Sequence, residues 1–176
     1  MRNGRPRVLV LGLGNEILSD DAIGLVVVRE LRKIFRDAEG LEFVETHLSG
    51  YNLLDFFIGY DAVVVVDSVI VDANEVGSVY FLDARELECR IEAHPHSLGI
   101  PEILKLCERA GLEVPRILKI AAIGIRDTEL GYGLSPEVEG ALPKIVERIR
   151  ELVESVLSEI RPPDPLGHFS TSRSRR

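Results

Sequence analysis

The run Val63-Val64-Val65-Val66 constrains the fold more than any other feature of the sequence. Four consecutive valines favour an extended chain, and they all avoid water only if both faces of that strand are buried. Strands buried on both faces are typical of parallel sheets that are covered by helices on each side. The sequence therefore predicts a central strand over residues 61–68. Asp67 lies at its carboxyl end, where open α/β sheets place their ligands.

Strand and helix patterns alternate through the rest of the chain. Apolar residues recur at three- and four-residue intervals from Ile23 to Phe35, which indicates a helix. Ser135-Pro136-Glu137 is typical of a second helix start, with an N-cap serine and a first-turn proline. Short apolar runs indicate further strands at residues 7–11, 41–46, 78–82 and 116–123. We expect an α/β fold, namely a three-layer α/β/α sandwich with a mostly parallel twisted sheet.

The length of 176 residues is enough for one domain with its own core. We place that domain at residues 8–160, between a basic extension at 1–7 and a disordered basic tail at 161–176 that is rich in Pro, Ser and Arg. The net charge is −8 although both ends are basic, so the body is acidic, which argues against nucleic acid. No apolar run approaches the roughly 18 residues of a membrane span, and nothing resembles a signal peptide. We expect a cytoplasmic monomer that binds neither nucleic acid nor a membrane.

A turn with two adjacent carboxylates follows the first predicted strand. Gly12-Leu13-Gly14 could begin a dinucleotide-binding loop, but Ile17 stands where a third glycine is needed. Asp20 and Asp21 would also repel a pyrophosphate, so a nucleotide-binding enzyme is the weakest hypothesis. One aspartate at a helix start can cap free amides, and we assign that role to Asp20. The second, Asp21, needs another explanation.

The segment Gly12-x-Gly14-Asn15-x-x-x-x-Asp20-Asp21-x-x-Gly24 resembles the opening motif of the hydrogenase maturation endopeptidases. These enzymes remove the C-terminal extension from the large subunit of nickel-iron hydrogenases. The resemblance covers about residues 8–157, and it implies that Asp21 and Asp67 are metal-contacting carboxylates. It also implies a third ligand, a histidine just before a helix. His96-Ser97-Leu98 resembles that motif, so His96 takes the role in preference to His94.

Two loops depart from the pattern of this family. Where its members usually have Asp-Gly-Gly-Thr, this chain has Glu45-Thr46-His47-Leu48-Ser49-Gly50. Glu45 is then the candidate for the family's carboxylate, and we interpret His47 as a solvated loop residue. In the last loop, residues 124–135, Arg126 or Asp127 stands where members often carry proline. The departures concern substrate recognition more than chemistry, because the implied metal contacts lie elsewhere.

The resemblance implies an endopeptidase that acts on a hydrogenase large-subunit precursor after nickel insertion. Asp21, Asp67 and His96 would recognise the nickel and would be both the metal-binding and the catalytic residues. Two oxygens and one nitrogen form an unsaturated site that suits nickel. The nickel would arrive with the substrate, so the isolated protein should hold no cofactor tightly.

The residues leave the cleavage chemistry open. No Ser or Cys lies beside a suitable base in the motif regions, so an acyl-enzyme route has little support. A metal-held water or a carboxylate could attack the peptide bond, and the sequence does not choose between them. The alternative function is a nickel-insertion checkpoint or chaperone without proteolysis.

Overall fold

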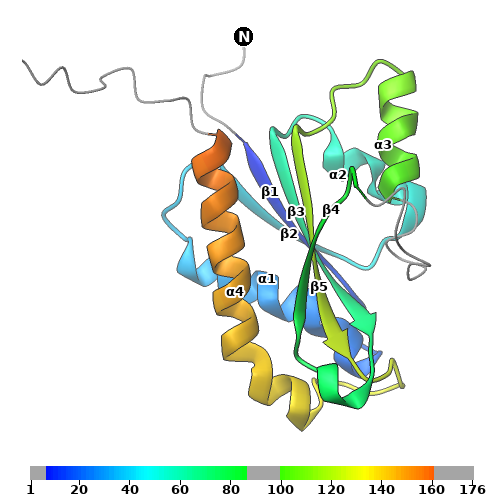
Figure 1. Ribbon diagram of the computed structural model, residues 1–176, viewed down its shortest axis with the longest axis vertical. Coiled ribbons are helices and arrows are strands. Elements are labelled where there is room, and N and C mark those ends of the chain that lie inside the picture. Colours follow the sequence, from blue (N-terminus) through cyan, green and yellow to red (C-terminus); the bar gives the residue numbers. More distant parts are fainter. Residues whose placement is uncertain (1–6, 87–99, 161–176) are drawn as a thin grey trace, which may run out of the picture.

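The computed structural model describes residues 7–86 and 100–160 (Figure 1). In this part of the chain five strands form one sheet, in the order β2-β1-β3-β5-β4. Strand β4 is antiparallel to β5, and the other neighbouring pairs are parallel. The strands are β1 (Val8–Leu13), β2 (Leu41–Thr46), β3 (Ala62–Ile70), β4 (Val79–Asp83) and β5 (Ile117–Ile125). The predicted α/β class and mostly parallel sheet are confirmed.

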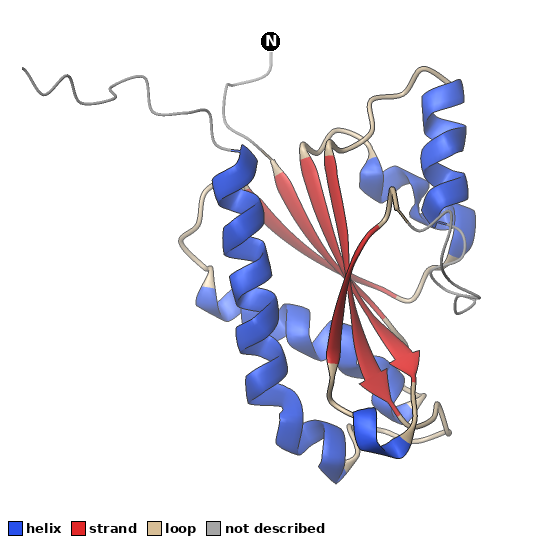
Figure 2. Ribbon diagram, in the orientation of Figure 1, coloured by secondary structure: helices blue, strands red, loops and turns tan. Residues whose placement is uncertain are grey.

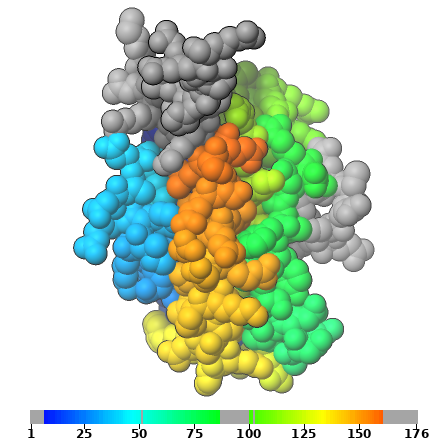
Figure 3. All heavy atoms as spheres, turned by 60° about the vertical axis from the view of Figure 1, so that its left-hand side comes forward, coloured from blue at the N-terminus to red at the C-terminus, as the bar shows by residue number. Residues whose placement is uncertain are grey.

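Helices cover both faces of this sheet (Figure 2). Helices α1 and α4 pack on one face, and α2 and α3 pack on the other. Their bounds are α1 (Ile23–Ile34), α2 (Leu54–Phe57), α3 (Ile100–Arg109) and α4 (Pro136–Ile160), with short 3₁₀ turns η1 (Ser19–Ala22), η2 (Gly50–Leu53) and η3 (Ala73–Glu75). Figure 3 shows α4 as a ridge along the face it covers, between the β2 and α1 side in blue and β4 in green. The three-layer sandwich is therefore the observed architecture.

The valine run forms the centre of the sheet, as predicted. Strand β3 pairs with β1 on one side and with β5 on the other, and all four valines are fully buried. Val64 and Val66 pack into the core beneath α1 and α4, while Val63 and Val65 pack beneath α2 and α3. Each valine thus contributes to one of two cores, which explains why the run contains no polar residue.

Strand β4 differs from its neighbours because it lies antiparallel at the edge of the sheet. Only residues 71–78, including η3, separate β3 from β4. A parallel return would need a crossover of about a dozen residues or more, so this short connection can only reverse the chain. The chain therefore reverses direction after β3, and β4 pairs with β5 in the antiparallel sense at the edge of the sheet.

The predicted basic extension lies, apart from Arg7, outside the described residues, as does the whole of the predicted tail. Among residues 7–86 and 100–160, none of the helices combines the length and the apolar composition of a membrane-spanning segment.

Candidate functional site

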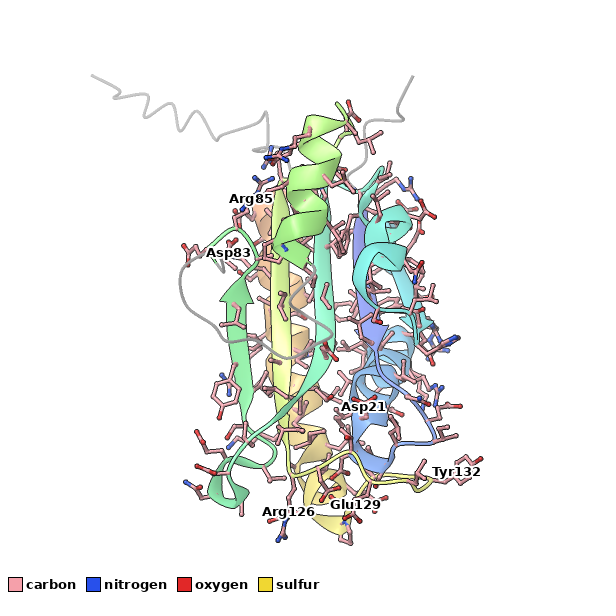
Figure 4. The ribbon with its side chains drawn as sticks, turned by 90° about the vertical axis from the view of Figure 1, so that its right-hand side faces the viewer. Asp21, Asp83, Arg85, Arg126, Glu129 and Tyr132 are labelled. Carbon is pink, nitrogen blue, oxygen red and sulfur yellow. The ribbon has the colours of Figure 1, made fainter. Side chains whose placement is uncertain are left out.

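The carboxyl ends of β1 and β3 meet where the order of the strands reverses. Strand β1 leads through α1 to β2 on one side, whereas the chain after β3 builds β4 and β5 on the other. A crevice forms at such a switch point because successive helices leave the sheet on opposite faces, and α/β proteins bind their ligands there. Asp21 and Asp67 both belong to this place. In Figure 4, Asp21 lies toward the end of the molecule that carries the loop after β5.

Glycines let the chain after β1 approach the strand ends closely. A Cβ atom added at Gly24 would lie 2.2 Å from the carbonyl oxygen of Leu13 and 2.6 Å from that of Val66. One added at Gly14 would lie 2.1 Å from the carbonyl oxygen of Asp21. Such distances leave no room for a side chain, so η1 and the first turn of α1 rest directly on β1 and β3. The glycine spacing of the motif thus has a packing role, and it holds Asp21 at the switch point.

Asp67 lies on β3 just beyond the end of its pairing with β1. That pairing runs from Ala62 to Val66, whereas the pairing with β5 continues to Ile70. The prediction that Asp67 ends the strand is therefore wrong in this detail, because β5 supports β3 for three further residues. The functional consequence is unchanged, since Asp67 borders the space that β1 leaves open. Its exposed fraction is 4%, the same as that of Asp21.

Ser68 contacts both carboxylates. Its hydroxyl donates a hydrogen bond to Oδ1 of Asp21 at 2.7 Å, and its backbone N–H donates one to Oδ1 of Asp67 at 2.8 Å. The first bond connects residues 47 positions apart in the chain. Sequence reasoning missed Ser68, because a serine after a strand aspartate has no signal of its own. Only the folded chain reveals that Ser68 orients the predicted pair.

Asp20 does not cap its own helix, which corrects the role assigned to it. The N-cap positions of η1 and α1 are Leu18 and Ala22, and neither makes a side-chain cap. Instead, Oδ1 of Asp20 accepts a hydrogen bond from the backbone N–H of Ser135 at 2.6 Å. Ser135 in turn caps α4, as predicted, through its hydroxyl and the N–H of Val138. Asp20, which is 3% exposed, therefore ties the acidic turn to the start of the last helix.

Replacing Asp20 with Ala is expected to lower the stability of the fold. The change leaves the N–H of Ser135 without its acceptor in a partly buried position, which costs about 1–3 kcal/mol. In a domain of this size that corresponds to a fall in melting temperature of roughly 2–10 °C. Asp20→Asn keeps an acceptor oxygen and should lose less. Thermal unfolding of the wild type and the two variants measures these changes. An unchanged melting temperature in Asp20→Ala would show that the hydrogen bond between Asp20 and Ser135 does not stabilise the fold.

A cleft of about 310 Å³ opens beside the site, at the ends of β1 and β2. Arg29 lies on its wall and contacts Glu16 at 2.5 Å and Glu45 at 2.6 Å. The hydrogen bond that Arg29 donates to the Glu16 carboxylate raises the pKa of the Arg29 guanidinium, which therefore stays charged. Glu45 also contacts Arg32, so the carboxylate that departs from the family pattern is part of an ion cluster. His47 is an exposed loop residue on the same cleft, as expected.

The predicted histidine ligand cannot be placed beside these carboxylates. Both His94 and His96 lie outside the described residues. Among the residues that are described, no three or more His, Cys, Asp or Glu side chains are grouped so as to hold a metal ion. The structure therefore brings together two of the three predicted residues, Asp21 and Asp67, through Ser68.

Comparison with known proteins gives one consistent result. A family model described as hydrogenase maturation protease matches residues 25–152, a segment that contains Asp67 and His96 and begins just after the glycine-rich motif. The hydrogenase 2 maturation protease of Escherichia coli is 28% identical over 145 residues, which cover 81% of this chain and 88% of that protein.

Solved structures agree with the sequence matches. The hydrogenase maturating endopeptidase HybD from E. coli superimposes with a TM-score of 0.68 at 27% identity, covering 85% of this chain and 93% of that one. The [NiFe] hydrogenase maturation protease HybD from Thermococcus kodakarensis gives a TM-score of 0.63 at 28% identity, with 83% and 98% covered.

Proposed function

Because this chain belongs to the hydrogenase maturation protease family, we propose that it removes the C-terminal extension of a nickel-iron hydrogenase large-subunit precursor after nickel insertion. Membership of the family makes the chain a hydrolase of the peptidase class. The observation that carries the finer proposal is the pair of buried carboxylates, Asp21 and Asp67, held by Ser68 at the switch point of the sheet.

The nickel of the precursor is proposed to bind Asp21, Asp67 and His96. Two carboxylates that are each 4% exposed favour a divalent cation, because a cation offsets their loss of water. The alternation of side chains along β3 directs Asp67 to the face that α2 and α3 cover. Helix α3 begins at Ile100, shortly after His96 in the sequence, which supports His96 as the third ligand.

The same carboxylates supply the chemistry of peptide hydrolysis. Asp21 has one oxygen engaged by the hydroxyl of Ser68, and this hydrogen bond limits the rotation of its carboxylate. A carboxylate fixed in this way can accept a proton from an attacking water, which is general-base catalysis. Nickel in this proposal is part of the substrate, so cleavage is confined to precursors that carry it. A peptidase that recognises its metal in the substrate needs no resident metal.

The proposal is tested by incubating the protein with a purified, nickel-loaded precursor and weighing the products by mass spectrometry. We expect two products whose masses sum to that of the precursor plus one water, with the cut near the carboxyl end. An intact precursor that nevertheless binds the protein would favour the checkpoint function without proteolysis.

Free nickel should bind the isolated protein only weakly. Two carboxylates and one histidine leave coordination positions open, and no thiolate adds affinity. Stabilisation by a ligand grows with its concentration relative to the dissociation constant, so the melting temperature should rise only at high nickel concentrations. The rise should vanish in Asp21→Ala and persist in the exposed control Asp55→Ala. Ser68→Ala should need about tenfold more nickel, since losing a group that orients a metal ligand lowers metal affinity by roughly 10–100-fold.

Thermal shift across a nickel titration measures all four proteins. A tightly held metal that survives dialysis against a chelator would contradict this prediction and indicate a resident-metal hydrolase. If the melting temperatures of Ser68→Ala and the wild type rise at the same nickel concentration, Ser68 does not contribute to the nickel site.

A further inference from the structure

Hydrogen bonds join the loop between β5 and α4 to the segment that carries Asp20 and Asp21. The backbone N–H of Gly131 donates to the carbonyl of Ile17 at 3.0 Å, and the N–H of Ser19 donates to the carbonyl of Gly131 at 2.9 Å. These bonds form a parallel bridge between Leu18 and Gly131. The hydroxyl of Ser19 adds a bond to the carbonyl of Gly133 at 3.3 Å. These bonds join the loop to the acidic turn.

Ser19 adopts a backbone conformation that is uncommon for a residue other than glycine. Its φ is 45°, the only positive φ at a non-glycine residue in the described part of the chain. Such conformations cost roughly 1 kcal/mol or more and persist where the surroundings impose them. Here the two hydrogen bonds to the loop impose it. Backbone strain of this kind occurs most often at functional sites, and this one directly precedes Asp20 and Asp21.

Three large apolar side chains stand exposed on these two joined segments. Leu130 is 82% exposed and Tyr132 is 87% exposed, on either side of Gly131, and Ile17 on the paired segment is 47% exposed. We call these three residues the apolar rim. In Figure 4, Tyr132 projects outward at the end of the molecule toward which Asp21 lies. Nothing in the packing of the core requires such side chains in water, and rigidly displayed apolar groups mark interaction surfaces.

We propose that the apolar rim is the surface on which the large-subunit precursor docks, an inference that rests on the proposed function. The N–H and the carbonyl of Gly131 bond to Ile17 and Ser19, so the rim adjoins the turn that carries Asp21, and a precursor that reaches Asp21 also lies close to the rim. Tyrosine and leucine on a prearranged support lose little entropy on binding, and buried aromatic anchors dominate interface energies. The occupant is therefore an apolar patch on the folded body of the precursor.

Charge indicates what should surround that patch on the precursor. This protein has a net charge of −8, and the loop before Leu130 carries Asp127 and Glu129 against one cation, Arg126. A negative surface attracts partners whose complementary face is basic and speeds their encounter. The rim should then contribute most to how long the complex lasts, because apolar anchors act mainly on dissociation.

The test uses a double variant, Leu130→Ser/Tyr132→Ser, and a matched double control, Leu106→Ser/Leu112→Ser. The control residues are 45% and 39% exposed, and they lie on and just after α3, near the opposite end of the strands. Processing of nickel-loaded precursor is followed at several precursor concentrations. We expect the rim variant to raise KM at least tenfold with kcat within twofold, while the control leaves both unchanged. An unchanged KM in the rim variant overturns the proposal.

A direct binding measurement separates this proposal from the proposed function. If the wild type cleaves no precursor, the proposed function fails, and the dissociation constant of the intact precursor is then compared between the wild type and the rim variant. A dissociation constant that is tenfold higher in the variant supports docking, and equal values or no binding by either protein overturn it. A third measurement is light scattering of the free protein, which gives its oligomeric state. A wild-type dimer that the rim variant converts to a monomer would assign the rim to a second copy of the chain and overturn docking of the precursor.

Discussion

Asp67→Asn is expected to abolish removal of the precursor's C-terminal extension while leaving the fold intact. Asparagine has the same shape as aspartate and keeps an oxygen that accepts the N–H of Ser68, so the local hydrogen bond at 2.8 Å can persist. The substitution removes the negative charge and replaces one carboxylate oxygen with an amide NH2 group, and a neutral amide is less costly to bury than a carboxylate. Without that charge, the nickel of the substrate loses a ligand and the site loses a carboxylate base.

We expect at least a thousandfold fall in the rate of cleavage, which corresponds to about 4 kcal/mol of transition-state stabilisation. Asp21→Asn should behave in the same way. The matched control is Asp55→Asn, because Asp55 is an exposed aspartate on α2. Cleavage is measured by mass spectrometry and folding by thermal unfolding. If Asp67→Asn still processes the precursor at more than a tenth of the wild-type rate, Asp67 is not part of the catalytic site.

Gly24→Ala is expected to destabilise the protein by about 3 kcal/mol or more, at the upper end of the effects of overpacking. The added Cβ would lie 2.2 Å and 2.6 Å from two backbone carbonyl oxygens, and neither oxygen can move without shifting β1 or β3. The substitution would therefore push α1 away from the strands and displace the turn that carries Asp21. Both stability and cleavage should fall together.

Gly140→Ala is the matched control for this substitution. Gly140 is also helical, but no atom lies within 4 Å of a Cβ added there. Alanine favours a helix over glycine, so this variant should gain about 0.5–1 kcal/mol. Urea unfolding of both variants gives the two free energies. A Gly24→Ala variant as stable as the wild type would show that the backbone contact is not needed to position the acidic turn.

Local patterns predicted the elements of the fold well. The valine run identified β3 as the central strand, and the predicted range of β2 matches Leu41–Thr46. Strands β1, β3 and β5 each run two residues further than predicted. The end of each strand depends on how far a neighbouring strand continues to pair with it. The sequence of one segment does not identify its neighbouring strands. Ile34 shows the same limit, because it follows the helical period of α1 yet is 52% exposed beyond the edge of the core.

The sequence predicts residues for the candidate site, and the structure adds contacts between them that no local pattern indicates. The motif resemblance selected Asp21 and Asp67, which the structure brings to one serine. It could not select Ser68, nor the partner of Asp20, which lies 115 positions away at Ser135. These contacts arise from the order of the strands and the close approach at Gly24, both of which are properties of the whole fold. The role of His96 remains a prediction from the resemblance.

We propose that this peptidase acts only on a precursor that already carries nickel. The most direct test compares wild-type cleavage of one precursor in its nickel-loaded and nickel-free forms, with mass spectrometry of the products over time. We expect complete removal of the extension from the loaded form and none from the nickel-free form. Equal cleavage of both forms would contradict it, because Asp21 and Asp67 would then act without recognising the metal.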